Sequence, residues 1–262
     1  MIESTTTVTV LLALFGLVGG VGITAVGPGG VLPTIGLFAL TDAAPAEVAG
    51  TAIVTHVATG VVGTVAYTRS GQLREHRTRR TALVLAGAAV VGTPTGVLVN
   101  GMVSESAFGV VLAGFMVWVA VLVWHRERRA SAATDPPAGS RVHRARSTPV
   151  LAGVGFVVAA ASGVVGVGGP MLAVPLLVAL GFPVLTSLAA AQVQSVVVAG
   201  TGTVGYVLDG SVDWSLATVI GLPELVGVLV GWRVARALPA RRLKLALVVV
   251  LLALAPYLAL HG

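Results

Sequence analysis

The sequence predicts an all-α, polytopic membrane protein that is built from two inverted repeats of helices. Hydrophobic residues make up 56% of the 262 residues and charged residues only 10%, whereas a soluble domain carries roughly 25% charged residues. All 16 Lys and Arg residues fall in three short clusters, and the chain between the clusters is apolar. Because Lys and Arg concentrate in cytoplasmic loops, the clusters predict both the environment and the orientation of the chain.

The three basic clusters lie between residues 69 and 80, 126 and 146, and 233 and 244. Each borders apolar stretches, and each is expected in a cytoplasmic loop. A sequence pI near 11.0 is also found in nucleic-acid-binding proteins. Basic residues that flank apolar spans anchor those spans, so the expected partner is the lipid bilayer and no nucleic acid.

Each half contains five apolar stretches. A hydrocarbon core of about 30 Å needs about 20 apolar residues per helix. In the first half the stretches are residues 7–27, 28–41, 45–67, 81–101 and 104–124. In the second half they are residues 149–166, 168–181, 183–207, 214–235 and 240–260. The second stretch of each half would span only ~21 Å as a helix, so eight to ten helical segments are expected, and whether the short ones cross or re-enter stays open.

The chain divides into three parts. Residues 1–124 are expected to form the first transmembrane repeat, 125–147 a basic cytoplasmic linker, and 148–262 the second transmembrane repeat. The linker contains Asp135-Pro136-Pro137-Ala138-Gly139-Ser140, a turn-forming polar run. Met1 to Thr7 carries Glu3 and no basic residue, which argues against a cleaved signal peptide and for an external N-terminus. The chain has no Cys, so disulfides and thiolate metal sites are excluded.

Aromatic residues mark the ends of several predicted spans. These residues are Trp118, Trp124, Trp214, Trp232, Tyr67 and Tyr206. They are expected to form aromatic belts at the two membrane interfaces.

The two halves repeat each other in sequence. Gly27-Pro28-Gly29-Gly30 matches Gly166-Val167-Gly168-Gly169 at an offset of 139, and the segment ending at Tyr67 matches the one ending at Tyr206. Tyr67 leads into the first basic cluster, whereas Tyr206 leads into residues 208–213, which hold two acids and no cation. Equivalent loops are therefore expected on opposite sides of the membrane. That relation defines an inverted-topology repeat, an architecture common among secondary transporters.

The glycine-rich junctions interrupt apolar runs in both halves. Pro28 and Pro170 remove backbone donors there, and glycine lets the chain leave the helix. Non-helical backbone at membrane depth is tolerated where it is buried in protein or lines a wet cavity. Free N–H groups at the start of the following short helix can bind an anion. The alternative is that these glycines serve only close helix packing or a kink.

Several polar side chains fall deep inside predicted spans. Together with the junctions, they give these candidate substrate-binding residues: Gly27, Gly29, Gly30, Thr51, Thr55, His56, Gly166, Gly168, Gly169, Gln192, Gln194 and Ser195. Polar groups in hydrocarbon are costly and should face the bundle interior. His56 and Glu224 are candidate proton carriers, because histidine titrates near neutral pH and a carboxyl also exchanges a proton. A satisfied interhelical hydrogen bond is the alternative for His56. No metal site or cofactor is expected.

Two segments of the second half resemble the sulfite exporter TauE/SafE family of membrane permeases. They are Gly163-Val164-Val165-Gly166-Val167-Gly168-Gly169-Pro170-Met171-Leu172-Ala173-Val174-Pro175 and Tyr206-Val207-Leu208-Asp209-Gly210-Ser211-Val212-Asp213-Trp214. The first-half copy, Gly27 to Pro33, is similar but looser, and it departs at Gly36, where the second half has Pro175. The resemblance covers nearly the whole chain except the linker. It implies a permease of the prokaryotic inner (plasma) membrane for small sulfur-containing anions such as sulfite or sulfonates.

These observations favour a secondary transporter for a small anion, working by alternating access at the glycine-rich breaks. No Lys or Arg falls near the predicted midplane, which favours a singly charged anion such as hydrogen sulfite or a monosulfonate over sulfate. A membrane-embedded enzyme or an anion channel is the alternative. An enzyme is disfavoured because the chain has no phosphate-binding loop, no His-Glu-x-x-His motif and no Gly-x-Ser-x-Gly motif. Transport direction, coupling ion and a homo-oligomeric state stay open.

Overall fold

The computed structural model describes residues 2–104 and 147–239, with a few isolated positions between 107 and 121 and between 242 and 249. In these residues the chain forms helices and turns and no strand, which confirms the all-α prediction. The predicted stretches 104–124 and 240–260 and the predicted linker 125–147 lie almost entirely outside the described residues.

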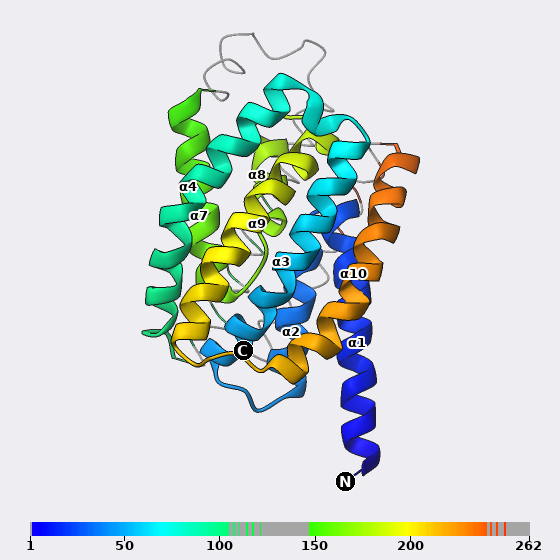
Figure 1. Ribbon diagram of the computed structural model, residues 1–262, viewed down its shortest axis with the longest axis vertical. Coiled ribbons are helices and arrows are strands. Elements are labelled where there is room, and N and C mark those ends of the chain that lie inside the picture. The colour runs from blue at the N-terminus through cyan, green and yellow to red at the C-terminus, as the bar shows by residue number, and fades with distance from the viewer. Residues whose placement is uncertain are drawn as a thin grey trace.

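The described helices follow the predicted order (Figure 1). The first half contains α1 (Ile2–Ala25), the 3₁₀ turn η1 (Pro28–Gly30), α2 (Val31–Leu40), α3 (Pro45–Arg69), the 3₁₀ turn η2 (Gln72–Arg74) and α4 (His76–Asn100). The second half contains α7 (Thr148–Val165), α8 (Pro170–Ala179), α9 (Val184–Leu208) and α10 (Trp214–Ala237). Among them α1, α3, α4, α7, α9 and α10 are long and apolar enough to cross a membrane. The predicted short helices are α2 and α8, with ten residues each.

Several cations expected in loops lie on helices instead. The helix α4 begins at His76, so Arg77 and Arg80 belong to its first turns, and Arg236 lies in the last turn of α10. Arginine has a long aliphatic stem that can pack along a helix while its guanidinium stays in water. A basic cluster therefore need not end a helix, and the loops are shorter than the sequence predicted.

The two halves interlock through their outer helices. In Figure 1, α1 lies beside α10, and α7 lies beside α4. Both contacts depend on glycine: a Cβ atom at Gly20 would overlap the carbonyl of Glu224, and one at Gly96 would overlap the carbonyl of Ala160. Helices approach this closely only where small residues line the contact. The first helix of each half thus packs against the last described helix of the other half.

Tyr67 and Tyr206 join their helices to the glycine-rich segments in the same way. The Tyr67 hydroxyl donates to the Thr24 carbonyl at 2.7 Å, and the Tyr206 hydroxyl donates to the Gly163 carbonyl at 2.6 Å. Donor and acceptor are 43 residues apart in both cases. The prediction that these tyrosines belong to an interfacial belt is wrong, since both are fully buried. A buried tyrosine needs a partner for its hydroxyl, and here that partner is a backbone carbonyl. Trp214, by contrast, is 60% exposed.

The loops that follow α3 and α9 lie at opposite ends of the bundle. At the start of α3, the Thr51 hydroxyl accepts a hydrogen bond from the Asp213 N–H at 2.9 Å. Just past the other end of α3, the Ser70 hydroxyl accepts one from the Trp232 indole at 3.4 Å. The length of helix α3 between Thr51 and Ser70 separates these two contacts by ~28 Å. Figure 1 shows the same separation, with the chain leaving α3 near the top and α9 near the bottom.

The two ends differ in charge. We call the end with η2, the start of α4 and the last turn of α10 the basic end, because the described arginines lie there. The guanidinium of Arg80 donates to the Thr148 hydroxyl at 2.7 Å, so α7 also starts at the basic end. We call the other end the acidic end. It holds the loops between α2 and α3 and between α9 and α10, whose acids are Asp42, Asp209 and Asp213.

Both short helices turn back to the end from which their chain entered. The helix α1 runs parallel to α10, with Gly16 against Ile220 and Val21 against Gly231, and therefore starts at the acidic end. After the junction, α2 returns to that end, where α3 begins. The pair α7 and α8 does the same from the basic end. With ten residues, or ~15 Å, each short helix spans about half of a bilayer.

This arrangement predicts that residues 74 and 209 lie on opposite sides of the membrane. The chain has no native Cys, so Arg74→Cys and Asp209→Cys can be made singly without altering other thiols. In sealed vesicles a membrane-impermeant maleimide should label only one of the two variants, and permeabilised vesicles should label both. Equal labelling of both variants in sealed vesicles would contradict the arrangement.

Candidate functional site

Both junctions begin at a glycine with positive φ, although ψ is −56° at Gly27 and 24° at Gly166. Gly27 follows α1 with φ 113°, and Gly166 follows α7 with φ 69°. Side chains rarely adopt such positive φ values, so glycine is the residue that can end these helices here. Each junction is buried against the other half: Gly27 faces Val174 of α8, and Gly166 faces Ala49 of α3.

The junctions meet between α3 and α9. A Cβ atom at Gly30 would lie 3.5 Å from the Gly168 nitrogen and 3.4 Å from His56 Nε2. One at Gly168 would lie 3.1 Å from Ser195 Oγ and 3.2 Å from His56 Cδ2. His56 on α3 and Ser195 on α9 occupy equivalent positions of the repeat, again 139 residues apart. We define Gly30, His56, Gly168, Gly169 and Ser195 as the candidate site.

Backbone donors are available in this site. Gly169 is the N-cap of α8, and Gly168 precedes it outside any helix. Neither N–H has a hydrogen-bond partner among the described residues, although both glycines are buried. Unpaired N–H groups at a helix N-terminus, where the helix dipole is positive, can bind an anion.

His56 is held between the first junction and α10. Its Nε2 lies 3.1 Å from the Gly30 carbonyl oxygen, and its Nδ1 lies 3.0 Å from Oε1 of Glu224. A carbonyl oxygen only accepts, so Nε2 carries the hydrogen and donates it. Nδ1 and the carboxylate then share one further proton. With that proton the pair is neutral overall, and without it the pair carries one negative charge.

Because the pair is buried, the charge difference between its two protonation states has a large energetic effect. His56 and Glu224 are 0% exposed, and Oε2 of Glu224 has no hydrogen-bond partner among the described residues. The Thr55 hydroxyl lies 3.5 Å from Nδ1 and donates to the Ala52 carbonyl at 2.9 Å. An unpaired charge is costly in such a place, so a change in protonation alters the energy of any anion nearby.

Other predicted site residues lie away from this centre. Thr51 binds Asp213 at the acidic end. The Gln192 amide donates to the Ile23 carbonyl at 3.4 Å, and the Gln194 amide donates to the Gly155 carbonyl at 3.0 Å. Gly29 packs against the backbone of α1. In this structure these residues join helices together, whereas Gly30, Thr55, His56, Gly168, Gly169, Ser195 and Glu224 are brought into one place.

The polar side chains at the candidate site are buried inside the bundle. His56, Ser195 and Glu224 are each 2% exposed or less. In the described part of the chain, no group of three or more His, Asp and Glu residues is placed to hold a metal ion. A ligand could reach the free N–H groups only after the helices around them move.

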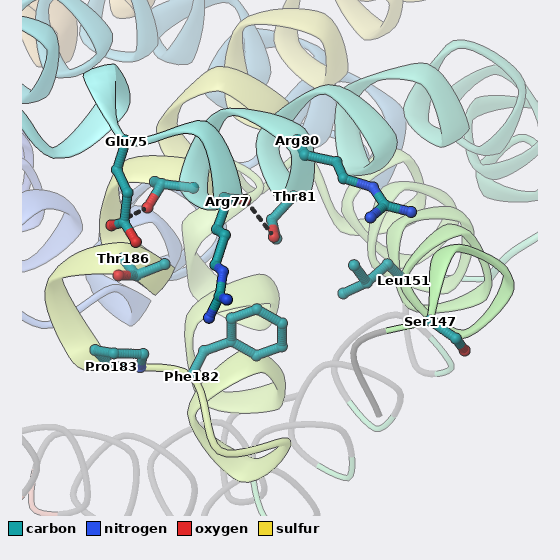
Figure 2. Close-up of a pocket in the computed structure, with 10 residues that line it drawn as sticks. Glu75, Arg77, Arg80, Thr81, Ser147, Leu151, Phe182, Pro183 and Thr186 are labelled. Atoms are coloured by element: carbon teal, nitrogen blue, oxygen red, sulfur yellow. Dashed lines mark hydrogen bonds between the residues drawn. The ribbon is translucent and has the colours of Figure 1, made fainter. Parts of the chain in front are cut away.

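A pocket of about 610 Å³ lies at the basic end, among residues that were not predicted as site residues. It is formed by the start of α4, the start of α7 and the connection between α8 and α9 (Figure 2). Its two arginines, Arg77 and Arg80, belong to the first basic cluster, which predicted only the orientation of the chain.

Two comparisons with known proteins match almost the whole chain. The family model described as "Sulfite exporter TauE/SafE" matches residues 12–258. The "Probable membrane transporter protein YdhB" of Bacillus subtilis (strain 168) is 24% identical over 242 residues, which cover 91% of this chain and 94% of that protein. No solved structure matches the chain.

The buried pair predicts a difference between two substitutions of Glu224. Glu224→Ala leaves Nδ1 of His56 without its partner and opens a cavity, so it should destabilise the fold by about 3 kcal/mol. Glu224→Gln keeps the shape and can donate to Nδ1, so the loss should be about 1 kcal/mol or less. Thermal unfolding of the purified variants in detergent measures both, with Asp42→Ala at the exposed acidic end as the control. Equal melting temperatures for all three variants would show that the pair does not stabilise the fold.

Proposed function

Because the chain belongs to the sulfite exporter TauE/SafE family, as its sequence resemblance predicted, we propose that this membrane transporter carries a small sulfur oxyanion. The proposed substrate is sulfite or an organosulfonate, and the proposed binding place is the candidate site. The observation that carries the proposal is the pair of unpaired, buried N–H groups of Gly168 and Gly169 beside His56 and Ser195.

The composition of the site favours an anion of low charge. The described arginines lie at the basic end, so none of them is placed to pair with a ligand at the centre. Backbone N–H groups, the Ser195 hydroxyl and the dipole of α8 stabilise one negative charge but compensate two charges poorly. Weak binding of the anion also allows its release on the other side of the membrane. We therefore favour hydrogen sulfite or a monosulfonate over sulfate.

Alternating access follows from the two re-entrant pairs. The pair α1–α2 approaches the site from the acidic end, and the pair α7–α8 approaches it from the basic end. Movement of one pair would open the site to one side while the other pair keeps it closed. The proposal thus treats residues 1–124 and 148–262 as inverted repeats, with 125–147 as the linker between them. It places the basic end in the cytoplasm of a prokaryotic cell.

The His56–Glu224 pair supplies a coupling mechanism. When the shared proton is present, the pair is neutral and an anion can bind beside it. When the proton is absent, the negative pair repels the anion at short range in a medium of low dielectric constant. Anion and proton would then move together, and one proton would offset the charge of one singly charged anion.

The transport experiment uses proteoliposomes and three anions at equal concentration: sulfite, 1-propanesulfonate and sulfate. Wild-type protein should move sulfite and the sulfonate at least about tenfold faster than sulfate, since a second buried charge costs more than 1.4 kcal/mol here. Gly168→Val should abolish this transport, because a Cβ atom there already lies within 3.2 Å of both Ser195 and His56. Gly200→Val is the control, since a Cβ atom at Gly200 meets nothing within 4 Å.

Full activity in Gly168→Val would place the substrate elsewhere. Equal rates for all three anions would remove the selectivity argument. No transport of any of them would remove the substrate assignment itself.

A second experiment tests the coupling with 1-propanesulfonate, whose own charge does not change between about pH 5 and pH 8. A proton gradient that drives protons in the same direction as the substrate should accelerate transport by wild-type protein several-fold. Glu224→Gln holds the pair permanently neutral, so transport should continue but ignore the gradient. His56→Gln should weaken the pH dependence to a smaller extent. If Glu224→Gln responds to the gradient as the wild type does, the proton is carried elsewhere.

A further inference from the structure

The pocket at the basic end combines two arginines with an apolar wall. Its lining includes Arg77, Arg80, Leu151, Phe182 and Thr186. Figure 2 shows Arg77 reaching toward Phe182, with Arg80 above Leu151. Leu151 on α7 belongs to the buried core, and Phe182, in the connection between α8 and α9, packs against that core, while the arginines are exposed.

The arginines keep most of their hydrogen-bonding capacity. The guanidinium of Arg77 has no hydrogen bond or ion pair with any described residue. Arg80 uses a donor for the Thr148 hydroxyl, and a guanidinium carries five. Glu75 also lines the pocket, but its carboxylate accepts from the Thr78 hydroxyl at 3.0 Å, and no ion pair links it to a described arginine. Two cations and one anion leave the pocket with a net positive charge.

Size and chemistry together indicate the class of ligand. A guanidinium fork matches the oxygens of a tetrahedral oxyanion. The volume of about 610 Å³ exceeds the need of an inorganic oxyanion several times over, and pockets of this size take organic molecules. Phe182, which is only partly buried, offers apolar surface to the rest of such a molecule. The lining therefore fits an anion that has a short hydrocarbon body.

The pocket is separate from the candidate site but lies along the same helices. The helix α8 runs from Gly169 at the candidate site to the connection that carries Phe182. Its ten residues correspond to ~15 Å. On α9, Thr186 in the pocket precedes Ser195 in the candidate site by nine residues. A ligand in the pocket would thus lie about the length of α8, ~15 Å, from the unpaired N–H groups.

We propose that this pocket is a second anion site, which binds the sulfonate group of an organosulfonate between Arg77 and Arg80 and its hydrocarbon body against Phe182. The inference rests on the proposed function in one respect: the ligand belongs to the class of anion that the protein is proposed to carry. Occupancy of the pocket itself does not require transport.

The test is calorimetric titration of the purified full-length protein with 1-propanesulfonate. The background is Gly168→Val, in which the candidate site is blocked, and size-exclusion chromatography checks that it stays folded. Binding should persist in this background. Adding Arg77→Gln and Arg80→Gln should weaken it at least about tenfold, because charge-assisted hydrogen bonds are lost. Adding Arg74→Gln and Arg79→Gln instead removes the same charge from the same cluster outside the pocket, and should change the dissociation constant less than about twofold.

Phe182→Ala tests the apolar wall. It should weaken the binding of 1-propanesulfonate more than that of methanesulfonate, which has no chain to bury. Should Gly168→Val not fold, the same comparisons are made in the wild-type background, where the arginine pair should remove one of two binding sites.

Three outcomes would overturn the inference. One is binding that disappears with Gly168→Val but survives the loss of Arg77 and Arg80 in the wild-type background. Another is an equal loss for both arginine pairs, which would reflect the general field of the cluster. The third is displacement of 1-propanesulfonate by phosphatidylglycerol in nanodiscs, with no such effect of phosphatidylcholine, which would assign the pocket to a lipid phosphate. Binding that follows the predicted pattern while proteoliposomes move no anion would overturn the proposed function and leave the pocket standing.

Discussion

The whole arrangement depends on one constraint: backbone N–H and C=O groups cannot be left facing lipid. A helix that stops halfway through a membrane exposes such groups. In this chain α1 and α7 both give way to short helices, and the two interruptions lie against each other between α3 and α9. Each break is enclosed by the other half of the molecule. Unpaired donors such as the Gly168 N–H are therefore enclosed by protein and do not face lipid.

Close packing of the outer helices keeps that enclosure in place. Lipid gives no hydrophobic reason for two apolar helices to associate, so association depends on van der Waals contact and hydrogen bonds. Gly16 and Gly20 of α1 meet carbonyls of α10, and Gly92 and Gly96 of α4 meet carbonyls of α7. The Tyr67 and Tyr206 hydroxyls fix the ends of α1 and α7 to the central helices. The site is thus held by contacts between halves more than by contacts within them.

Composition, hydropathy and repeat spacing predicted the helices well, because each depends on local sequence. The glycine junctions, the burial of His56 and Glu224 and the short α2 and α8 all follow from such signals. Side-chain partners were harder to predict. Nothing local in the sequence tells that Glu224 of α10 faces Nδ1 of His56, that Gln194 points to Gly155, or that Tyr67 is buried. These depend on which helices cross and at what height. The pocket at the basic end could not be predicted for the same reason, since Arg77 and Phe182 are distant in sequence.

Packing of α1 on α10 and of α7 on α4 also constrains when the native fold can form during synthesis. Ribosomes deliver α1 first, but its partner α10 is synthesised some 200 residues later. Until α10 is made, the glycine-lined face of α1 lacks the carbonyls that it packs against in the folded protein. The first half alone lacks α7 as well, so α4 is equally incomplete. The native packing of either half is therefore completed only by the other half, because both outer contacts cross between them.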